Sequence, residues 1–241
     1  MSIYDDLIAA MEPGLDSEAV VVGAFITAVK STKRCGLSTT LRPEGRPHAA
    51  PAMKKPGELS GMPLFDLARL VFSKLPMEAS LGMAAINAAL PLGDLNPVEK
   101  NGAELLMEKA EEANLVMVGH FSFVHKITPK TRSTAILELD PREDELPASA
   151  AKRVIPEADV VAITGSAFSN HTIEPLLELC RGKWVMAIGP TAPLSPVLFD
   201  YGVDAIAGSV VSDPDLTLRQ AGQGAIFKQL TGASRVLLVK E

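Results

Sequence analysis

The chain has 241 residues, of which 47% are hydrophobic and 22% are charged. This composition is typical of a folded globular protein, because it supplies enough apolar surface to offset the entropy of the chain. Lys and Arg number 23 against 29 Asp and Glu, so the net charge is −6, and aromatic residues make up only 5%. Nucleic-acid binding needs a basic field and aromatic stacking platforms, so we expect no nucleic-acid partner.

The chain shows no signal for export or for a membrane. Residues 1–14 are acidic and lack the basic segment and apolar core of a signal peptide. The uncharged stretch 184–199 contains three prolines and is too short to span a bilayer. Cys35 and Cys180 cannot build a disulfide framework, and reduced thiols are expected. We therefore expect a cytoplasmic protein without a membrane partner.

The first elements are a helix and two strands. Residues 3–11 predict a short helix, and the β-branched run 19–29 predicts a strand. A second strand is predicted at 35–43, and the short connection between the two favours an antiparallel hairpin. Residues 43–63 are rich in proline and glycine, which predicts a loop with a third short strand at 48–52.

Two helices follow this loop. Residues 63–74 place apolar side chains on one face, and residues 77–90 are apolar nearly all round, which is typical of a helix buried between two layers. Proline and glycine at 91–97 then end the helical pattern. We place a domain boundary there, with a small α+β domain at 1–96 and a second domain at 97–241.

The second domain alternates apolar strands with helices. Strands are predicted at 115–119, 134–140, 158–164, 184–189, 203–208 and 235–239, and helices at 101–113, 171–180 and 216–230. This alternation implies a parallel sheet covered on both faces. The predicted fold class is α/β: a Rossmann-like, doubly wound, mostly parallel sheet preceded by the smaller α+β domain.

The candidate ligand site lies where these strands end, because ligands of open α/β sheets bind at the carboxyl edge. The ends carry most of the small and hydroxyl residues of the domain. The candidates are His120, Phe121, Ser122, Glu138, Thr164, Gly165, Ser166, Pro190 and Thr191.

The segment 164–172 is the most informative of these strand ends. Gly165 permits a tight turn, and Ser166, Asn170 and Thr172 are residues that cap a helix start. Free backbone N–H groups at such a start favour an anion such as a carboxylate or a phosphate. An ordinary strand-to-helix turn explains the same residues, so both interpretations stay open.

A nucleotide site receives mixed support. Gly119 stands alone where G-x-G-x-x-G would be needed, and His120 and Phe121 would obstruct a pyrophosphate. Glu138 follows Gly119 by 19 residues (138 − 119), close to the spacing at which an acid holds a ribose hydroxyl. A nucleoside-like ligand therefore stays open, while a standard NAD site is disfavoured. The alternative for Glu138 is a solvent-facing or salt-bridged carboxylate.

A metal site is possible from scattered ligands only. The chain lacks H-E-x-x-H and C-x-x-C, so no closed zinc site is specified, and it lacks the G-x-S-x-G of a nucleophile elbow. His120 and His171 both follow strand ends, and with Glu138 they are the candidate ligands of a divalent transition metal; Cys35 is a further candidate. The alternative is that each histidine is a hydrogen-bonded surface or turn residue.

Three segments, 78–88, 164–177 and 188–208, resemble a bacterial and archaeal domain-of-unknown-function family named for heavy-metal chelation. The similarity runs over nearly the whole chain, with D-x4-T-G-S-x3-N-x-T from Asp159 to Thr172 and G-P-T-x-P from Gly189 to Pro193. The resemblance implies a Rossmann-like domain after a domain shaped like the N-terminal domain of enolase, with a site between them.

By this resemblance, one wall of the site holds Thr164, Gly165, Ser166, Asn170, Pro190 and Thr191. Asn87 and the turn 35–38, which begins at Cys35, face that wall. The family often has phenylalanine followed by proline where this chain has Phe121 and Ser122, so this part of the wall is expected to differ in shape.

Two classes of function follow. The first is a metal-handling protein that binds a divalent transition metal, or a small metal-chelating molecule, in the interdomain cleft. The alternative is an enzyme or a sensor that binds a small anionic or nucleoside-containing metabolite there, because one fold serves many functions. Apolar residues around Phe65, Leu70 and Phe72 favour a homodimer.

Overall fold

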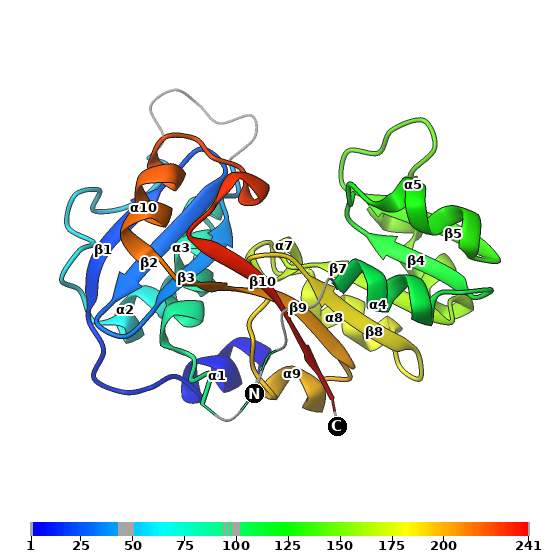
Figure 1. Cartoon of the computed structure of the whole chain (residues 1–241), viewed down its shortest axis with the longest axis horizontal. Coiled ribbons are helices and arrows are strands. Elements are labelled where there is room, and N and C mark those ends of the chain that lie inside the picture. Colours follow the sequence, from blue (N-terminus) through cyan, green and yellow to red (C-terminus); the bar gives the residue numbers. More distant parts are fainter. Residues whose placement is uncertain (1, 43–50, 94, 96, 98–101, 241) are drawn as a thin grey trace.

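The structure, a computed structural model, describes residues 2–42, 51–93, 95, 97 and 102–240. A small three-stranded antiparallel sheet is followed by a seven-stranded, mostly parallel sheet with helices (Figure 1). This confirms an α/β protein in which a small sheet precedes a large one. Among the described residues, none of the helices has both the length and the apolar character that crossing a bilayer requires.

The small sheet has the strand order β1-β2-β3. Its strands are β1 (Ser17–Val22), β2 (Ile26–Ser31) and β3 (Cys35–Thr39). The prediction of an antiparallel pair is confirmed for β2 and β3, but the prediction of one strand over 19–29 is wrong. Gly23 donates its N–H to the Ile26 carbonyl at 3.0 Å and turns the chain there. Of the predicted strand at 48–52, residues 48–50 lie outside the described residues, and 51 and 52 form no strand.

Helices cover one face of the small sheet. They are α2 (Leu64–Ala68), the 3-10 turn η1 (Arg69–Phe72) and α3 (Pro76–Ala89), and α1 (Ile3–Ala9) precedes the sheet. The helix α3 packs against β2 and β3 on one side and against α2 and η1 on the other. Eleven of its fourteen residues are buried. The predicted helix between two layers is therefore confirmed.

The large sheet has the order β10-β9-β8-β7-β4-β5-β6. Its strands are β4 (Asn114–Val118), β5 (Ser133–Glu138), β6 (Leu146–Pro147), β7 (Val160–Thr164), β8 (Trp184–Ile188), β9 (Ala205–Val211) and β10 (Ala233–Val239). Strands β4 to β9 pair in parallel, whereas β10 runs antiparallel to β9, which is a departure from the parallel pattern that alternation predicts. The two-residue strand β6 was not predicted.

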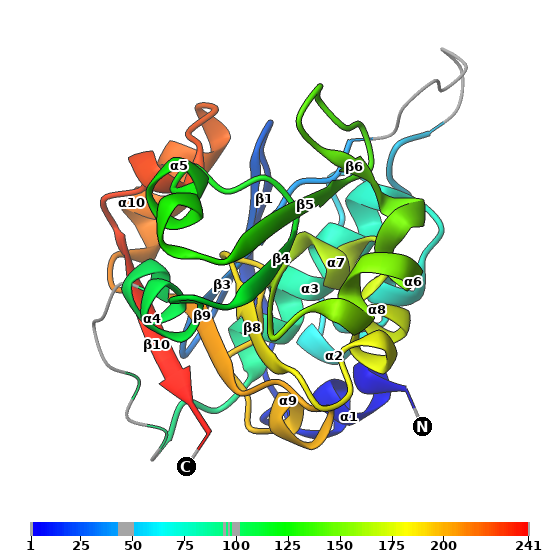
Figure 2. The same cartoon turned by 90° about the vertical axis from the view of Figure 1, so that its right-hand side faces the viewer.

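Helices lie on both faces of this sheet (Figure 2). Leu115 and Met117 of β4 belong to a cluster with α4 and α5, while Val116 between them belongs to the core on the opposite face. The helices of this part are α4 (Gly102–Lys109), α5 (Val124–Ile127), α6 (Ala151–Val154), α7 (Ser166–Ser169), α8 (Ile173–Leu179), α9 (Val197–Asp200) and α10 (Pro214–Gly222). The 3-10 turns are η2 (Thr128–Lys130), η3 (Ala148–Ala150), η4 (Ile155–Glu157) and η5 (Phe227–Gln229).

Several predicted helices are shorter than their patterns suggest. The helix predicted at 63–74 ends at Ala68 and continues as η1, and the helix predicted at 101–113 ends at Lys109. The helix predicted at 171–180 begins at Ile173, because His171 has a φ of 62° and stands in the left-handed region that interrupts a helix. The helix predicted at 216–230 ends at Gly222 and is followed by η5. The helix α10 leaves the large sheet and packs on β1 and β2 of the small one (Figure 1).

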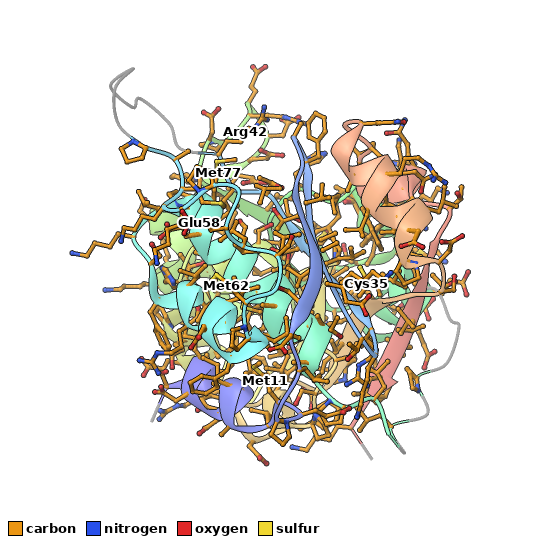
Figure 3. All side chains as sticks on the ribbon, turned by 90° about the vertical axis from the view of Figure 1, so that its left-hand side faces the viewer. Met11, Cys35, Arg42, Glu58, Met62 and Met77 are labelled. Carbon is orange, nitrogen blue, oxygen red and sulfur yellow. The ribbon has the colours of Figure 1, made fainter. Side chains whose placement is uncertain are left out.

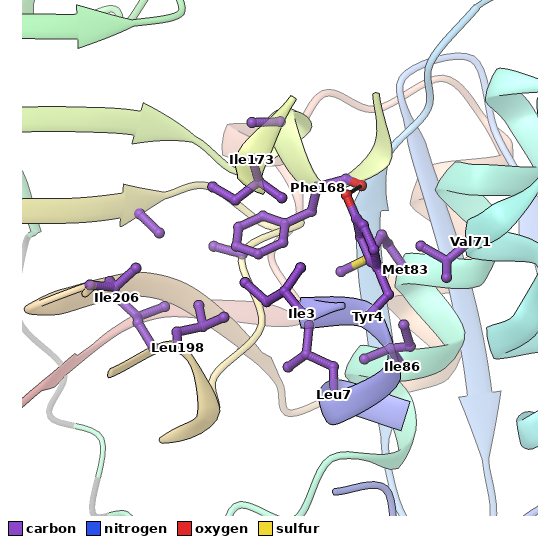
Figure 4. Close-up of a cluster of buried hydrophobic side chains, with 14 of the residues drawn as sticks. Ile3, Tyr4, Leu7, Val71, Met83, Ile86, Phe168, Ile173, Leu198 and Ile206 are labelled. Atoms are coloured by element: carbon purple, nitrogen blue, oxygen red, sulfur yellow. Dashed lines mark hydrogen bonds between the residues drawn. The ribbon is translucent and has the colours of Figure 1, made fainter. Parts of the chain in front are cut away.

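The N-terminal helix α1 joins the two parts of the chain. Ile3, Tyr4 and Leu7 lie in one buried cluster with Phe168 of α7 and Leu198 of α9 (Figure 4). The Tyr4 hydroxyl donates to the Phe168 carbonyl at 2.8 Å, so the helix is anchored by a polar contact as well as by apolar burial.

One face beside α2 carries exposed apolar side chains. Phe65 is 52% exposed and Phe72 is 43% exposed. Figure 3 shows this side of the molecule, with Met11 and Met62 on it. Cys35 and Cys180 are both free and buried.

Candidate functional site

The order in which strands are added to the large sheet switches sides at β4. From β4 the chain proceeds outward through β5 and β6, and then returns to the other side of β4 to form β7, β8 and β9. The carboxyl ends of β4, β5 and β7 therefore lie next to one another at the point where the strand order switches. Ligands of open α/β sheets bind in the crevice at such a point.

A pocket of about 490 Å³ occupies this position, which is within the size range of small-molecule sites. We call it the carboxyl-edge pocket. Its apolar walls are Leu41, Val118, Leu137, Leu139, Ala148, Ala151, Pro175, Leu176 and Leu179. Gly119 also lines it, and its polar groups come from His120, Glu138, Ser149, Lys152, Thr164, Ser166, Asn170 and Thr172. Five of the predicted site residues are thus brought together, namely His120, Glu138, Thr164, Ser166 and Asn170.

Gly119 allows the ends of β4 and β7 to approach each other at the pocket floor. Its φ is 104°, and a Cβ added there would lie 2.8 Å from the Cβ of Thr164. Any side chain at 119 would therefore be strained and would collide with Thr164. A single glycine at the end of β4 is explained by this close approach.

Glu138 is held at the end of β5 by two backbone donors. Its Oε1 accepts from the His120 N–H at 2.6 Å, and its Oε2 accepts from the Leu139 N–H at 3.1 Å. These contacts fix the carboxylate and leave each oxygen a further lone pair for hydroxyl groups of a ligand.

The His120 ring is oriented by two residues of the loop after β5. Its Nδ1 lies 2.7 Å from Glu145 Oε1, and its Nε2 lies 3.3 Å from Arg142 Nη1. The side chain of Glu145 is 4% exposed. The Arg142 backbone N–H and then the His120 ring hold the pKa of Glu145 below its ordinary value. The pair is therefore a histidine backed by an ionised carboxylate.

This depressed pKa predicts an acid-dependent contribution to stability. Because the folded pKa of Glu145 lies below the unfolded value of about 4.3, its contribution is present above that pH and is lost as the pH falls through the folded pKa. Glu145→Gln should therefore lose less stability than the parent protein between neutral and acid pH. Urea unfolding measured at several pH values checks this.

The control for this experiment is Glu143→Gln in the same loop. Glu143 makes no hydrogen bond or ion pair within the described part of the chain, so its variant should keep the parent's acid dependence. Identical pH profiles for Glu145→Gln and the parent would contradict the predicted shift.

Sequence reasoning missed several contributors to the pocket and its surroundings, among them Glu145, Ser149, Lys152 and Leu41. Glu145 and Lys152 lie in the long connection after β5, and Leu41 comes from the segment after β3. The Lys152 side chain is exposed and has no partner among the described residues. In the sequence, only the high proportion of charged residues in 140–152 could have indicated that this connection contributes to a site.

Other predicted site residues lie outside the carboxyl-edge pocket. Phe121 packs against Phe123 with ring centroids 5.4 Å apart, on the face of the sheet that α4 and α5 cover. Ser122 is exposed to solvent. Gly165 packs closely on the chain at Ala192, where an added Cβ would meet the backbone nitrogen at 2.7 Å.

Pro190, Thr191, Asn87 and Cys35 lie at the joint between the two sheets. Thr191 is fully buried, and its Oγ1 accepts from the Thr39 N–H of β3 at 2.8 Å. The other three residues line a second, smaller cavity. Burial raises the pKa of Cys35 to about 12, so its thiol is protonated and is a weak metal ligand and nucleophile.

The structure does not bring His171 together with His120 and Glu138. The His171 Nε2 lies 2.5 Å from the Val71 carbonyl, and its ring packs edge-on against Tyr4. Across the described residues, no three or more His, Cys, Asp or Glu side chains converge on a point that would hold a metal ion. The residues that the structure describes therefore do not fit a metal centre built from protein ligands alone.

The fold and the carboxyl-edge pocket define an α/β protein with a small-molecule-sized pocket at the switch point of a mostly parallel sheet. Residues 101–240 match the DUF364 family and residues 4–90 match the DUF4213 family, both with the description "Putative heavy-metal chelation". The chain belongs to this family, and the resemblance inferred from its motifs is confirmed.

Solved structures agree over almost the whole chain. A DUF364-family protein of unknown function from Desulfitobacterium hafniense DCB-2 matches with a TM-score of 0.87 and 27% identity, over 99% of this chain and 98% of that one. One from Pyrococcus horikoshii matches with a TM-score of 0.81 and 18% identity over the same shares, which shows the fold alone.

A further relative matches a smaller part of the chain. An uncharacterized protein of Methanocaldococcus jannaschii is 30% identical over 170 residues, which are 66% of this chain and 64% of that protein. The match therefore spans less than two thirds of the relative's own length.

Proposed function

We propose that the chain binds a small hydroxyl-bearing anionic metabolite, of the nucleoside monophosphate kind, in the carboxyl-edge pocket. The observation that carries the proposal is the Glu138 carboxylate, held at the end of β5 by the N–H groups of His120 and Leu139 inside a pocket of about 490 Å³. An acid at the end of the second strand of such a sheet is placed to accept from ribose hydroxyls.

The remaining walls suit the other parts of such a molecule. Lys152 offers an unpaired ammonium for an anionic group. Leu139, which is 72% exposed, and Leu176 offer apolar surface to a planar base. An enzyme and a sensor would use the same pocket, and turnover of the ligand distinguishes them.

Calorimetric titration with AMP and adenosine tests the proposal. We expect saturable binding of AMP that Glu138→Gln weakens by about tenfold or more, because a hydrogen bond to a charged group contributes about 1.5–3 kcal/mol. Adenosine should bind more weakly than AMP, because Lys152 then has no anion to pair with.

Glu143→Gln is the matched control, since it removes the same charge from a residue that does not line the carboxyl-edge pocket. Equal affinities of Glu138→Gln and Glu143→Gln for AMP, or no binding of either probe to the parent protein, would contradict the proposal.

Metal handling is a second candidate, supported by the family description. The described residues hold no cluster of ligands for a bare ion. We therefore place the metal on a chelating molecule that the protein binds, so that the molecule supplies most of the donor atoms. Thermal unfolding of metal-stripped protein is measured with a divalent transition metal alone, with the same metal as its citrate chelate, and with AMP. Stabilisation by the chelate but not by AMP favours metal handling, and stabilisation by AMP alone favours the first candidate.

We further propose the finer architecture that the sequence predicts: a small enolase-N-terminal-like domain over 1–96 and a Rossmann-like domain over 97–241. The order β6-β5-β4-β7-β8-β9 supports the second part, since it corresponds to the order 3-2-1-4-5-6 of that fold. The exposed Phe65 and Phe72 support a homodimer, and sedimentation measurements test it.

A further inference from the structure

Two buried polar atoms lack a partner in the part of the chain that the structure describes. They are Arg34 Nε and Asn87 Oδ1, and both residues line the same small cavity, of about 70 Å³. Folded proteins nearly always pair such atoms with protein groups or with a bound molecule, because an unpaired buried donor or acceptor is costly. A donor and an acceptor that both lack partners at one cavity point to an occupant that supplies the complementary groups.

This cavity, which we call the joint cavity, lies between the two sheets. Residues 35–37 of β3 form one wall, residues 209–211 of β9 form another, and the loop after β8 contributes Pro190, Ala192 and Leu194. Cys35, labelled in Figure 3, belongs to the first wall. The joint cavity shares no lining residue with the carboxyl-edge pocket, so it is a separate feature of the fold.

The orientation of the Asn87 amide is determined by its neighbours. Its Nδ2 donates to the Leu37 carbonyl at 2.8 Å and to the Thr191 carbonyl at 3.1 Å. Only the amide nitrogen can satisfy two carbonyl oxygens, because the amide oxygen has no proton to donate. The Oδ1 atom is therefore directed away from these carbonyls and requires a donor from elsewhere.

Arg34 brings an excess of positive charge to the cavity. Its Nη2 donates to Glu12 Oε1 at 2.6 Å, and Lys33 pairs with the other oxygen of the same carboxylate. Two cations thus share one anion. The unpaired Nε–H is a donor that favours a negatively charged oxygen as its acceptor.

The volume limits the size of the occupant. At about 10–15 Å³ for each water, the cavity holds about five to seven waters or a molecule of similar size. Leu37, Leu90 and Leu194 make most of the remaining surface apolar. The occupant therefore needs one anionic acceptor and one hydroxyl donor on a very small carbon frame.

We propose that the joint cavity is a binding site for a small hydroxycarboxylate. The carboxylate accepts from Arg34 Nε, and the hydroxyl donates to Asn87 Oδ1. Such a molecule pairs both unpartnered atoms at once and balances the charge that Glu12 leaves uncompensated. Ordered water offers the same donors and acceptors without the charge, and the experiment distinguishes the two occupants.

The experiment titrates the full chain with three probes in a calorimeter or by NMR. Glycolate carries both groups, acetate lacks the hydroxyl, and ethylene glycol lacks the carboxylate. We expect saturable binding of glycolate, with acetate and ethylene glycol each at least about tenfold weaker. Equal affinities for the three probes, or no saturable binding of glycolate, would overturn the proposal.

Two variants test whether glycolate binds in the joint cavity. Arg34→Lys keeps the charge but removes Nε, and it should weaken glycolate about tenfold. Leu92→Phe adds bulk at a lining residue without altering either polar atom, and it should also weaken glycolate binding. Arg69→Lys is the control, because Arg69 lies over the Phe65 ring and does not line this cavity.

A crystal soaked in glycolate completes the test. Density for a hydroxycarboxylate between Arg34 and Asn87 supports the site, whereas density for water alone shows a solvent-filled joint and overturns it. Affinity for AMP is measured in parallel, because the two cavities share no lining residue. If a variant of the joint cavity loses glycolate binding but keeps its affinity for AMP, the result concerns this cavity alone and leaves the proposed function unaffected.

Discussion

Gly82→Ala should destabilise the native state by about 3 kcal/mol or more. Gly82 lies in α3, where an added Cβ would stand 2.1 Å from the Val71 nitrogen and 2.7 Å from its Cα. Both atoms are backbone atoms of η1, so no side-chain rotation relieves the collision. Because α3 is held on its other side by β2 and β3, it cannot move away without opening the core of the small sheet.

The matched control is Gly222→Ala at the end of α10. A Cβ there would lie 3.6 Å from Val21 Cγ1, which is an ordinary contact, and alanine favours the helix by about 0.5–1 kcal/mol. Urea unfolding followed by circular dichroism measures both variants. If the two variants had equal stability, the spacing between α3 and η1 would have to be larger than the structure shows.

Phe168→Ala should destabilise the protein by about 3–5 kcal/mol. Phe168 is among the largest fully buried side chains, and it lies with Ile3 and Leu198 in the cluster of Figure 4. Removing the ring leaves a cavity that helices from both parts of the chain surround. The same change loosens α7, which carries Ser166 of the carboxyl-edge pocket, so AMP binding should weaken as well.

Phe25→Ala serves as the control for this variant. Phe25 is 40% exposed, so its truncation should cost less than about 1 kcal/mol and leave AMP binding unchanged. Unfolding by urea and calorimetric titration are carried out on both variants. A loss of stability for Phe168→Ala no larger than that for Phe25→Ala would show that α7 is not part of the core.

The large sheet was predictable because its strands are continuous apolar runs separated by helices. Such runs indicate strands that are buried on both faces of a sheet. The apolar character of a run can be recognised from neighbouring residues alone. The positions of His120, Glu138 and Thr164 at strand ends were predictable for the same reason, since parallel strands end at one edge. The direction of β10, which is antiparallel to β9, was not predictable, because an apolar run such as 235–239 does not itself specify the direction in which it pairs.

The site was predicted less completely than the sheet. Glu145 reaches His120 across 25 residues of chain, and no periodicity records such a contact. His171 follows the same strand end as Ser166, but its left-handed backbone turns the ring toward Val71 and Tyr4. Asn87 does not stand out in the apolar pattern of α3. Its place at the joint depends on hydrogen bonds to carbonyls of β3 and of the loop after β8.

The α/β class, the apolar strands of the large sheet other than β6 and the polar character of their ends follow from the sequence, because each reflects the local alternation of apolar and polar residues. Which of those ends share a pocket is known only from the folded chain, as are the return of α10 to the small sheet and the meeting of Arg34 and Asn87 at one cavity. These outcomes depend on contacts between residues distant in the chain, whose geometry is set by packing rather than by local preference.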